Sequence, residues 1–187
     1  MIITVALFLT SVVQLSRSVT PNQVSVDLYL AENGALLNHV IEWKTNEFWL
    51  GNDILRDLTG SGQWQLRVDI EDWEPSSAWA SYGEFNVTGD KYTIHVGLYD
   101  HQSTAGDALK YHNGYPFTTK DQDNDKRSDN CAAVYGGAWW FNSCQTALLN
   151  SDYQQGNVIN GRAIQWSPWK GSNHPLKSCS MKIRPIK

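Results

Sequence analysis

The sequence predicts an α+β fold, with an antiparallel sheet, short helices and a long loop-rich region. Three observations support this prediction: apolar and polar residues alternate within segment 64–98, a short helical pattern precedes it, and periodicity fades after about residue 100. The chain has 187 residues and a formal charge of −4, which leaves room for one domain and gives no basic surface for nucleic acid.

A short helix is predicted between Asn52 and Gly60. Asn52 and Asp53 are favourable N-cap residues, and Gly60 is a favourable terminator. The residues predicted on the buried side of this helix are Ile54, Leu55 and Leu58.

The segment WQLRVDIED alternates cleanly and predicts a strand at residues 64–72. Its apolar residues, which face one side of the sheet, are Trp64, Leu66, Val68 and Ile70. The carboxylates of the segment DIEDWE are predicted to lie on the opposite, solvated side beside Arg67. They are therefore an unconvincing catalytic acid pair, because a general acid needs a dry pocket that raises its pKa.

A β-hairpin is predicted next, because GEFNV and KYTIHVGL flank the turn signal TGDK. Its inward-facing residues are predicted to be Phe85, Val87, Tyr92, Ile94, Val96 and Leu98. Asn86 falls on the outward face and begins the N-glycosylation sequon Asn86-Val87-Thr88, so an exported chain is predicted to carry a glycan there. The ending MKIRPIK predicts a final strand.

Residues 1–18 are predicted to be a secretory signal peptide. The apolar run from Ile2 to Leu9 has the length of a signal-peptide core and is too short to span a bilayer, and Ser16 and Ser18 are small residues suited to cleavage. The alternative is a buried strand, since Ile-Ile-Thr-Val is favourable β sequence. The following residues, 19–45, receive no structural assignment, and no other segment reaches membrane-spanning length.

The stretch TTKDQDNDKRSDNC concentrates four aspartates and two asparagines before a cysteine. It is either a solvated turn or a cation site. The alternation of Asp121, Asp123 and Asp125 can aim several carboxylates at one point, and hard cations such as calcium take six to eight oxygens. An EF-hand is excluded, because its required Gly and Glu positions hold Lys126 and Ala132.

The three cysteines, Cys131, Cys144 and Cys179, are too few to define a disulfide framework by counting. Neither CxxC nor HxxxH occurs, so the sequence lacks the closely spaced ligand pairs of a zinc site. With a signal peptide upstream, pairing Cys131 with Cys144 is the simplest interpretation. The sequence contains no nucleophile-base pair, phosphate loop or catalytic metal signature, so we expect a binding protein and not an enzyme.

Six motifs along residues 46–187 resemble the C-terminal fibrinogen-related domain. In order, they are NEFWLGND, QLRVDIEDWE, GDALKYHNGYPFTTKDQDNDKRSDNCA, GGAWWFNSC, QWSPWKG and MKIRPI. The family includes fibrinogen chains, ficolins, tenascins, angiopoietins and microfibril-associated glycoprotein 4. The resemblance implies the family's fold, with its loop-rich calcium-binding subdomain and a disulfide between Cys131 and Cys144. Complete family domains have a further N-terminal segment that residues 19–45 do not resemble, so we expect an N-terminally abbreviated domain.

In this family a calcium ion is held by two aspartate side chains and two main-chain carbonyls. The resemblance places the side chains at Asp123 and Asp125 and the carbonyls at Arg127 and Asp129. The family usually has a small residue at the last position, so Asp129 adds a negative charge near the site. The aspartate-rich loop thus most resembles a structural calcium site.

The resemblance also implies a ligand pocket beside the disulfide. Acetyl-binding members have an aromatic residue at the position of Tyr135 and a cis Cys-His peptide, whose histidine is replaced here by Gln145. Two further pocket aromatics of those members fall near Asn160 and Ser172 and are absent. Gln145 offers a hydrogen-bond donor and an acceptor, so a polar ligand is expected.

Together these inferences predict a secreted, calcium-dependent recognition protein that binds glycans or acetylated and other polar ligands, with a lectin-like role in innate immunity. One alternative is an extracellular-matrix or receptor-binding module that acts by protein contact. A second is a truncated paralogue that binds nothing. Neither a G-x-y repeat nor a sustained heptad indicates an oligomeric state.

Overall fold

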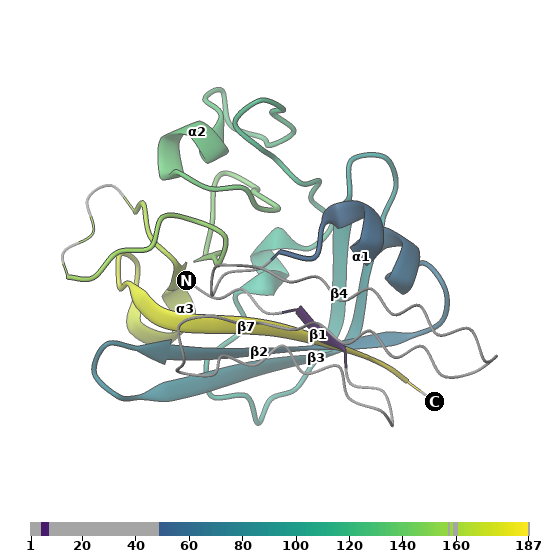
Figure 1. Ribbon diagram of the computed structural model, residues 1–187, viewed down its shortest axis with the longest axis horizontal. Helices are drawn as coiled ribbons and strands as arrows, with labels where there is room; N and C mark the ends of the chain where they lie inside the picture. Colours follow the sequence, from purple (N-terminus) through teal and green to yellow (C-terminus); the bar gives the residue numbers. More distant parts are fainter. Residues whose placement is uncertain (1–4, 8–48, 157, 159–160, 187) are drawn as a thin grey trace, which may run out of the picture.

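A five-stranded sheet is the central element of the computed structural model, which describes residues 5–7, 49–156, 158 and 161–186 (Figure 1). The strand order is β1-β7-β2-β3-β4. Its strands are β1 (Val5–Leu7), β2 (Trp64–Asp72), β3 (Ser77–Thr88), β4 (Thr93–Tyr99) and β7 (Leu176–Pro185). Strands β7, β2, β3 and β4 pair antiparallel, and β1 joins β7 in parallel. The predicted α+β fold with an antiparallel sheet is therefore confirmed.

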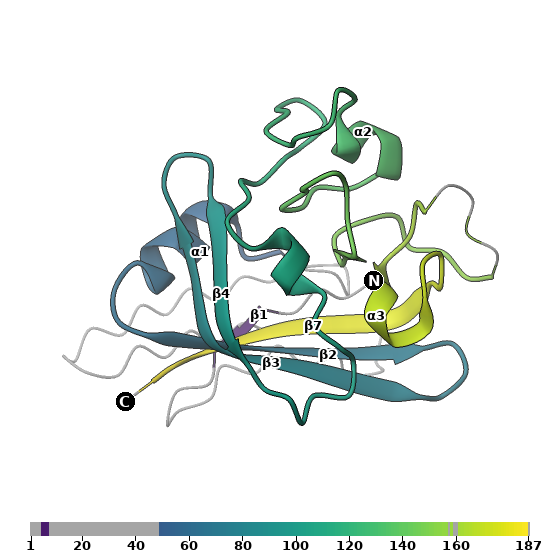
Figure 2. The same ribbon diagram turned by 180° about the vertical axis from the view of Figure 1, so that it is seen from behind.

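The remaining elements are short and lie on one side of this sheet, as both ribbon views show (Figures 1 and 2). They are α1 (Asn52–Thr59), the 3₁₀ helix η1 (Leu109–His112), α2 (Cys131–Tyr135), β5 (Ala147–Leu148), β6 (Gln165–Trp166) and α3 (Ser167–Lys170). Most of the chain between β4 and β7 is irregular and packs as a loop-rich layer above the sheet. This layer contains the aspartate-rich loop.

The predicted signal peptide and the unassigned segment that follows it lie outside the described residues, apart from β1. Strand β1 falls within the predicted signal peptide, and its three residues pair in register with Met181, Lys182 and Ile183 of β7. Signal-peptide cleavage therefore stays a prediction.

Helix α1 occupies the predicted segment, although its buried side differs from the prediction. Leu55 is buried as predicted, whereas Ile54 is 42% exposed, so its predicted burial is wrong. The second buried residue is Thr59, whose hydroxyl donates to Leu55 O at 2.7 Å and accepts from Val87 N at 3.0 Å. This hydroxyl satisfies a main-chain donor of β3, and it fixes the helix against that strand by a polar contact that apolar periodicity could not indicate.

The predicted alternation holds along β2 and along most of the hairpin of β3 and β4. The inward residues Leu66, Val68, Val87 and Ile94 are all fully buried. Leu98 is the exception: it is 70% exposed, so its predicted inward position is wrong. Leu98 lies against Gly83, where a Cβ would come within 2.9 Å of Leu98 Cβ, and glycine has no side chain to cover it.

Asp72 also departs from the prediction that the carboxylates of its segment face solvent. It shares the parity of Ile70 along β2, and its side chain is completely buried. Its Oδ2 lies 3.0 Å from Lys170 Nζ and accepts a hydrogen bond from Ser76 Oγ at 2.8 Å. By contrast, Asp69 pairs with Lys182 on the other face at 2.8 Å. Asp72 thus joins the end of β2 to α3 in the loop-rich layer.

We expect Asp72→Asn to destabilise the protein at neutral pH by about 1–3 kcal/mol, because it leaves a buried charged hydrogen-bond network incomplete. Burial alone would raise the pKa of Asp72, but hydrogen bonds from Ser76 and Lys170 lower it to about 2. A depressed folded-state pKa contributes stability above the unfolded value of about 4, and this contribution disappears as the pH falls toward 2. Urea unfolding at several pH values measures the difference between variant and parent.

The matched control is Asp57→Asn, since Asp57 pairs with Arg56 on an exposed surface of α1. Surface pairs contribute little, so this variant should change the unfolding free energy by less than about 0.5 kcal/mol. A gap between Asp72→Asn and the parent that stays constant from pH 7 to pH 2.5 would contradict the assigned role of Asp72.

Candidate cation site and ligand pocket

Two asparagine side chains close the aspartate-rich loop. Asn124 Nδ2 donates to Phe117 O at 2.8 Å, and Asn130 Nδ2 donates to Thr119 O at 2.9 Å. Asn130 is also the N-cap of α2, where its Oδ1 accepts from Ala133 N at 3.0 Å. These asparagines satisfy main-chain groups and fix the loop against the start of α2.

Within this loop, two of the three alternating aspartates are held beside each other. Asp125 accepts hydrogen bonds from the main-chain nitrogens of Arg127 and Cys131, each at 2.8 Å. Asp123 Oδ1 accepts from Asp125 N at 3.1 Å. Asp121 turns elsewhere and accepts from Thr119 Oγ1 at 2.6 Å. The structure therefore groups Asp123 with Asp125 and leaves Asp121 out.

Asp125 is in an unfavourable electrostatic position as the loop stands. Partial burial raises its pKa, and the neighbouring Asp123 carboxylate raises it further, against the lowering effect of the two main-chain donors. Within the described part of the chain, no three His, Cys, Asp or Glu side chains converge on one point. The predicted ligands, the Asp123 and Asp125 carboxylates and the carbonyls of Arg127 and Asp129, are all oxygens, the donor type that a hard cation such as calcium takes.

A disulfide joins the end of this loop to the next segment. Cys131 and Cys144 are bonded, with 5.7 Å between their Cα atoms. The peptide bond between Ser143 and Cys144 is cis. The family resemblance indicates a cis bond one position later, between Cys144 and Gln145. Cys179 is buried on β7, and its Sγ lies 3.8 Å from Leu149 O.

Beside this disulfide lies a cavity of about 570 Å³, lined by the end of α2, by residues 143–145 and by the turn after α3. Both predicted ligand residues, Tyr135 and Gln145, line it. Gln145 Oε1 is buried and accepts no hydrogen bond from the described residues. We call this cavity the disulfide pocket.

Four polar residues of the disulfide pocket were missed by sequence reasoning: Ser143, Gln165, Ser167 and Asn173. The Gln165 side chain donates to Gly161 O at 3.2 Å and accepts from Asn173 N at 2.9 Å. Asn173 adopts a left-handed conformation with φ of 67°, which asparagine tolerates. The Gly-Ser-Asn turn signal of the sequence could have indicated this conformation, but the contact with Gln165 is tertiary.

Of the two positions where pocket aromatics are absent, Ser172 is exposed and lines the pocket, whereas Asn160 lies outside the described residues. The predicted glycosylation site, Asn86, is not part of this pocket and lines a separate hollow on β3.

The Arg127 side chain extends from the aspartate-rich loop to the wall of the pocket. Its Nη2 lies 3.1 Å from Asp129 Oδ2, while its Nη1 donates to Tyr135 OH at 3.4 Å and lies 3.7 Å from Cys144 Sγ. Only the carbonyl of Arg127 was assigned a role from the sequence. Its guanidinium is thus an additional link between loop and pocket.

His112 fixes the segment that follows Gln145. The imidazole is fully buried; Nδ1 donates to Trp140 O at 2.7 Å, and Nε2 accepts from the main-chain nitrogens of Thr146 and Ala147 at 3.3 and 3.1 Å. Burial lowers the pKa of His112 to about 4, against the raising effect of the Trp140 carbonyl. The neutral ring is therefore the form that holds this wall of the pocket.

Residues 29–186 of the chain match the family described as the C-terminal globular domain of fibrinogen beta and gamma chains. The chain belongs to this family. Human fibrinogen C domain-containing protein 1 is 42% identical over 151 residues, which cover 76% of this chain and 32% of that protein. Human tenascin-R is 42% identical over 142 residues, which cover 75% of this chain and 10% of that protein. The chain thus spans about a third or less of the length of these relatives.

Solved structures of the family share the fold. The fibrinogen-like globe domain of human ANGPTL6 has a TM-score of 0.72 and 34% identity, covering 79% of this chain and 68% of that one. Lamprey fibrin D-dimer, in complex with the peptide Gly-His-Arg-Pro-amide, has a TM-score of 0.71 and 32% identity. The match covers 79% of this chain and 53% of the lamprey chain.

Family membership indicates an extracellular recognition or binding module. In the portion of the chain that the structure describes, the helices are all too short or too polar to cross a membrane.

We expect the stability of this fibrinogen C-terminal domain to fall as the pH is lowered from about 6.5 to 4. A folded-state pKa below the unfolded value means that the unfolded chain binds the proton more readily, so stability rises with pH across this window. A shift from about 6.5 to about 4 corresponds to roughly 3 kcal/mol. Chemical denaturation at pH 7, 5.5 and 4 measures it.

The variant His112→Gln should lower stability at pH 7 and flatten the pH dependence between 6.5 and 4. The control is His101→Gln, since His101 is exposed; it should retain the slope of the parent. A parent-like slope in His112→Gln would assign the pH dependence to another group.

Proposed function

We propose that this chain is an extracellular recognition module that binds polar groups of glycans or of proteins in the disulfide pocket, with calcium held in the aspartate-rich loop. The described residues that line the pocket include no acid, histidine or lysine. The lining instead provides hydroxyl and amide groups that can form hydrogen bonds with a ligand, which supports a binding role.

One series of contacts carries the proposal, because it connects the candidate cation site to the pocket. The Asp125 carboxylate accepts a hydrogen bond from Cys131 N, and Cys131 is bonded through the disulfide to Cys144, which lines the pocket. Arg127 adds a second connection, from the same carboxylate to Tyr135 OH. A change in the position of Asp125 is therefore transmitted to two walls of the pocket.

Calcium would supply charge compensation in the loop, since it is coordinated by several oxygens and two adjacent carboxylates repel each other without it. The residues that would hold it are Asp123 and Asp125 by their side chains, and Arg127 and Asp129 by their carbonyls. The proposed role is thus structural, in that it keeps the loop in the conformation that shapes the pocket.

The chemistry of the pocket favours an uncharged polar group as the ligand. Gln145 Oε1 is a buried acceptor with no donor from the described residues, and burying such a group without a donor is unfavourable. An amide N–H or a hydroxyl of a ligand would satisfy it. The Tyr135 ring provides an apolar surface beside this acceptor. Acetylated amines and sugar hydroxyls both combine these features.

A second candidate function is a matrix- or receptor-binding module that acts by protein contact. Two findings favour it: the relative tenascin-R, and the lamprey fibrin structure that contains a bound peptide. A glycan array, read with and without chelator, separates the two functions. Chelator-sensitive glycan binding supports the first, and chelator-insensitive binding to a matrix protein or receptor supports the second.

Calcium should stabilise the protein, and Asp123→Ala or Asp125→Ala should abolish this effect. Extracellular calcium modules bind with a Kd of ~10⁻⁴ to 10⁻³ M. In ~1 mM calcium, occupancy would then add about 0.4 to 1.4 kcal/mol to the unfolding free energy. Differential scanning fluorimetry with and without calcium measures the shift in Tm, and titration calorimetry gives the affinity.

Asp121→Ala is the matched control, because Asp121 lies in the same loop but its carboxylate binds Thr119. It should retain the calcium-dependent shift. Arg127→Ala should also retain it, since only the carbonyl of this residue is assigned to the cation. Equal calcium affinity in Asp123→Ala and the parent would defeat the assignment.

Gln145→Ala should weaken binding to acetylated serum albumin by about 3- to 10-fold, the effect of one hydrogen bond to a neutral group. Surface plasmon resonance measures this, with EDTA added to test calcium dependence. Ser128→Ala is the control, since Ser128 is exposed on the neighbouring loop and does not line the pocket. Unchanged binding in Gln145→Ala would place the ligand outside the disulfide pocket.

A further inference from the structure

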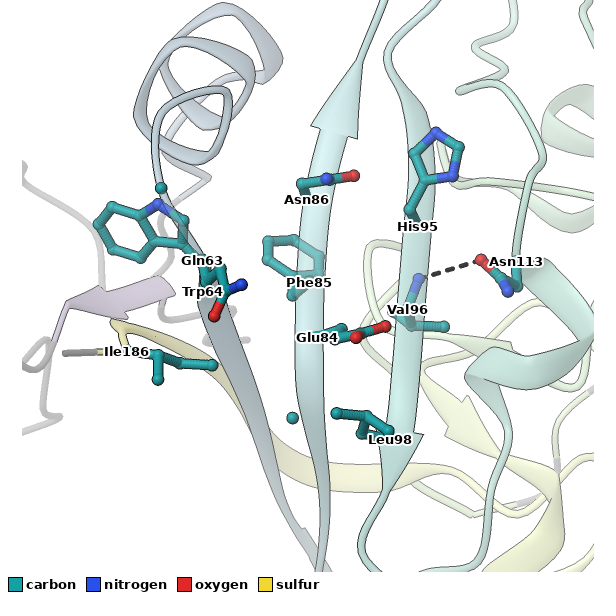
Figure 3. A pocket seen from close by; sticks show the side chains of 12 residues that line it. Gln63, Trp64, Glu84, Phe85, Asn86, His95, Val96, Leu98, Asn113 and Ile186 are labelled. Carbon is teal, nitrogen blue, oxygen red and sulfur yellow. Dashed lines mark hydrogen bonds between the residues drawn. The ribbon is translucent and has the colours of Figure 1, made fainter.

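The disulfide pocket differs in the charge of its lining from a second hollow, which lies over the β3–β4 hairpin. Glu84 and His95 are among the residues that line this hairpin hollow, beside Gln63 and Asn86 (Figure 3). The described lining of the disulfide pocket is uncharged, and most of its side chains are hydroxyls and amides. A ligand of the disulfide pocket is therefore selected by hydrogen bonds and apolar contact, and not by an opposite charge.

Gly161 keeps a small space open in the disulfide pocket beside both Tyr135 and Asn173. A Cβ at this glycine would lie 3.2 Å from the Tyr135 ring and 3.3 Å from Asn173 Oδ1. The φ of 69° at Gly161 also disfavours a residue with a side chain. The aromatic ring and the amide therefore border the same space, so that one ligand can contact an apolar face and a polar group together.

Four side chains of the disulfide pocket have hydrogen-bonding capacity that the described residues do not use. Gln145 Oε1 is buried without a donor. The Asn173 amide makes no hydrogen bond with the described residues, because the contact of Asn173 with Gln165 uses its main-chain nitrogen. The Ser167 and Ser172 hydroxyls contact only each other among the described side chains, at 3.4 Å. The pocket thus offers several acceptors and several donors to one ligand.

Main-chain bonds fix these groups on the small sheet of β5 and β6. Ser167 N donates to Thr146 O at 2.8 Å, directly after Gln145 in the chain. Asn173 N donates to the side chain of Gln165, which is the first residue of β6. The polar groups are therefore held in place before a ligand arrives, which lowers the entropy that binding costs.

An acetyl group cannot use all of these groups. Its acetamide has one N–H and one C=O, and its methyl group gains nothing from the hydroxyls of Ser167 and Ser172. Adjacent hydroxyls of a sugar each donate and accept, and the C–H face of the ring can pack on an aromatic side chain. We propose, building on the proposed function, that the disulfide pocket selects adjacent hydroxyls of an unacetylated neutral hexose. The ring packs on Tyr135, and the hydroxyls bond to Gln145 and Asn173.

Surface plasmon resonance with the full chain tests this ligand class in calcium-containing buffer. Serum albumin carrying mannose, glucose or galactose is compared with acetylated serum albumin at matched density. At least one hexose conjugate should bind about 3- to 10-fold more tightly than acetylated albumin, the effect of one additional hydrogen bond to a neutral group. Mild periodate cleaves the carbon–carbon bond between adjacent hydroxyls, so it should abolish binding of that conjugate.

Asn173→Gly tests the assigned contact in the protein. Glycine keeps the left-handed conformation of residue 173 and the main-chain bond to Gln165, and it removes only the amide. This variant should bind the hexose conjugate about 3- to 10-fold more weakly, and its affinity for acetylated albumin should fall less. The matched control is Gln63→Ala, which removes an exposed amide from the hairpin hollow and should leave hexose binding unchanged.

Three results would overturn the hexose assignment: tighter binding to acetylated albumin than to every hexose conjugate, hexose binding that resists periodate, or a larger effect of Gln63→Ala than of Asn173→Gly. The proposed function would still stand if Gln145→Ala weakens binding of acetylated albumin. If neither kind of probe binds the parent protein, the proposed function fails and the hexose assignment fails with it.

Discussion

The Asp125 carboxylate is the point on which the loop-rich layer depends, because it satisfies main-chain donors on two sides of a turn. One oxygen accepts from Arg127 N within the loop, and the other accepts from Cys131 N at the first residue of α2. Carboxylate bonds to main-chain N–H groups are charge-assisted and stronger than neutral ones. The nearby Asp123 makes the same carboxylate electrostatically unfavourable. The Asp125 carboxylate is thus strongly hydrogen-bonded and, at the same time, repelled by its neighbour.

Two buried polar side chains, His112 and Asp72, fix the loop-rich layer by hydrogen bonds and an ion pair. His112 satisfies three main-chain groups in the segments around Trp140 and Ala147, and Asp72 receives Lys170 and Ser76 at the end of β2. Irregular segments cannot satisfy their own main-chain groups, so buried side chains have to do so. The pocket therefore has walls fixed at three places: the disulfide, the segment held by His112, and the turn that follows α3.

How much of this could be predicted from the sequence depends on whether the contact is local or tertiary. Alternation along β2 and along the second half of β3 predicted the buried residues correctly, because a strand has a fixed period. The first half of β3, with Ala78, Ala80 and Tyr82 buried, was not predicted, since the burial pattern of β3 changes phase between Tyr82 and Phe85. The prediction for Leu98 failed because its neighbour Gly83 has no side chain to cover it. The prediction for Asp72 failed because its carboxylate was grouped with its neighbours and not assigned by parity. The residues Tyr135 and Gln145 came from family resemblance. The contacts of Arg127 and Gln165 could not be predicted, since they depend on how α2 and the turn after α3 meet.

Asp129, the one calcium-site position that departs from the family pattern, is paired with the side chain of Arg127. Asp129 alone would add negative charge beside two carboxylates, and Arg127 alone would place a positive charge at the pocket wall. Their side chains pair at 3.1 Å, so each largely cancels the field of the other. While Nη2 of Arg127 pairs with Asp129, its Nη1 still donates a hydrogen bond to Tyr135 OH. Truncating Asp129 alone would leave that guanidinium uncompensated, and anionic ligands would then be favoured over the uncharged polar groups that the present lining suits.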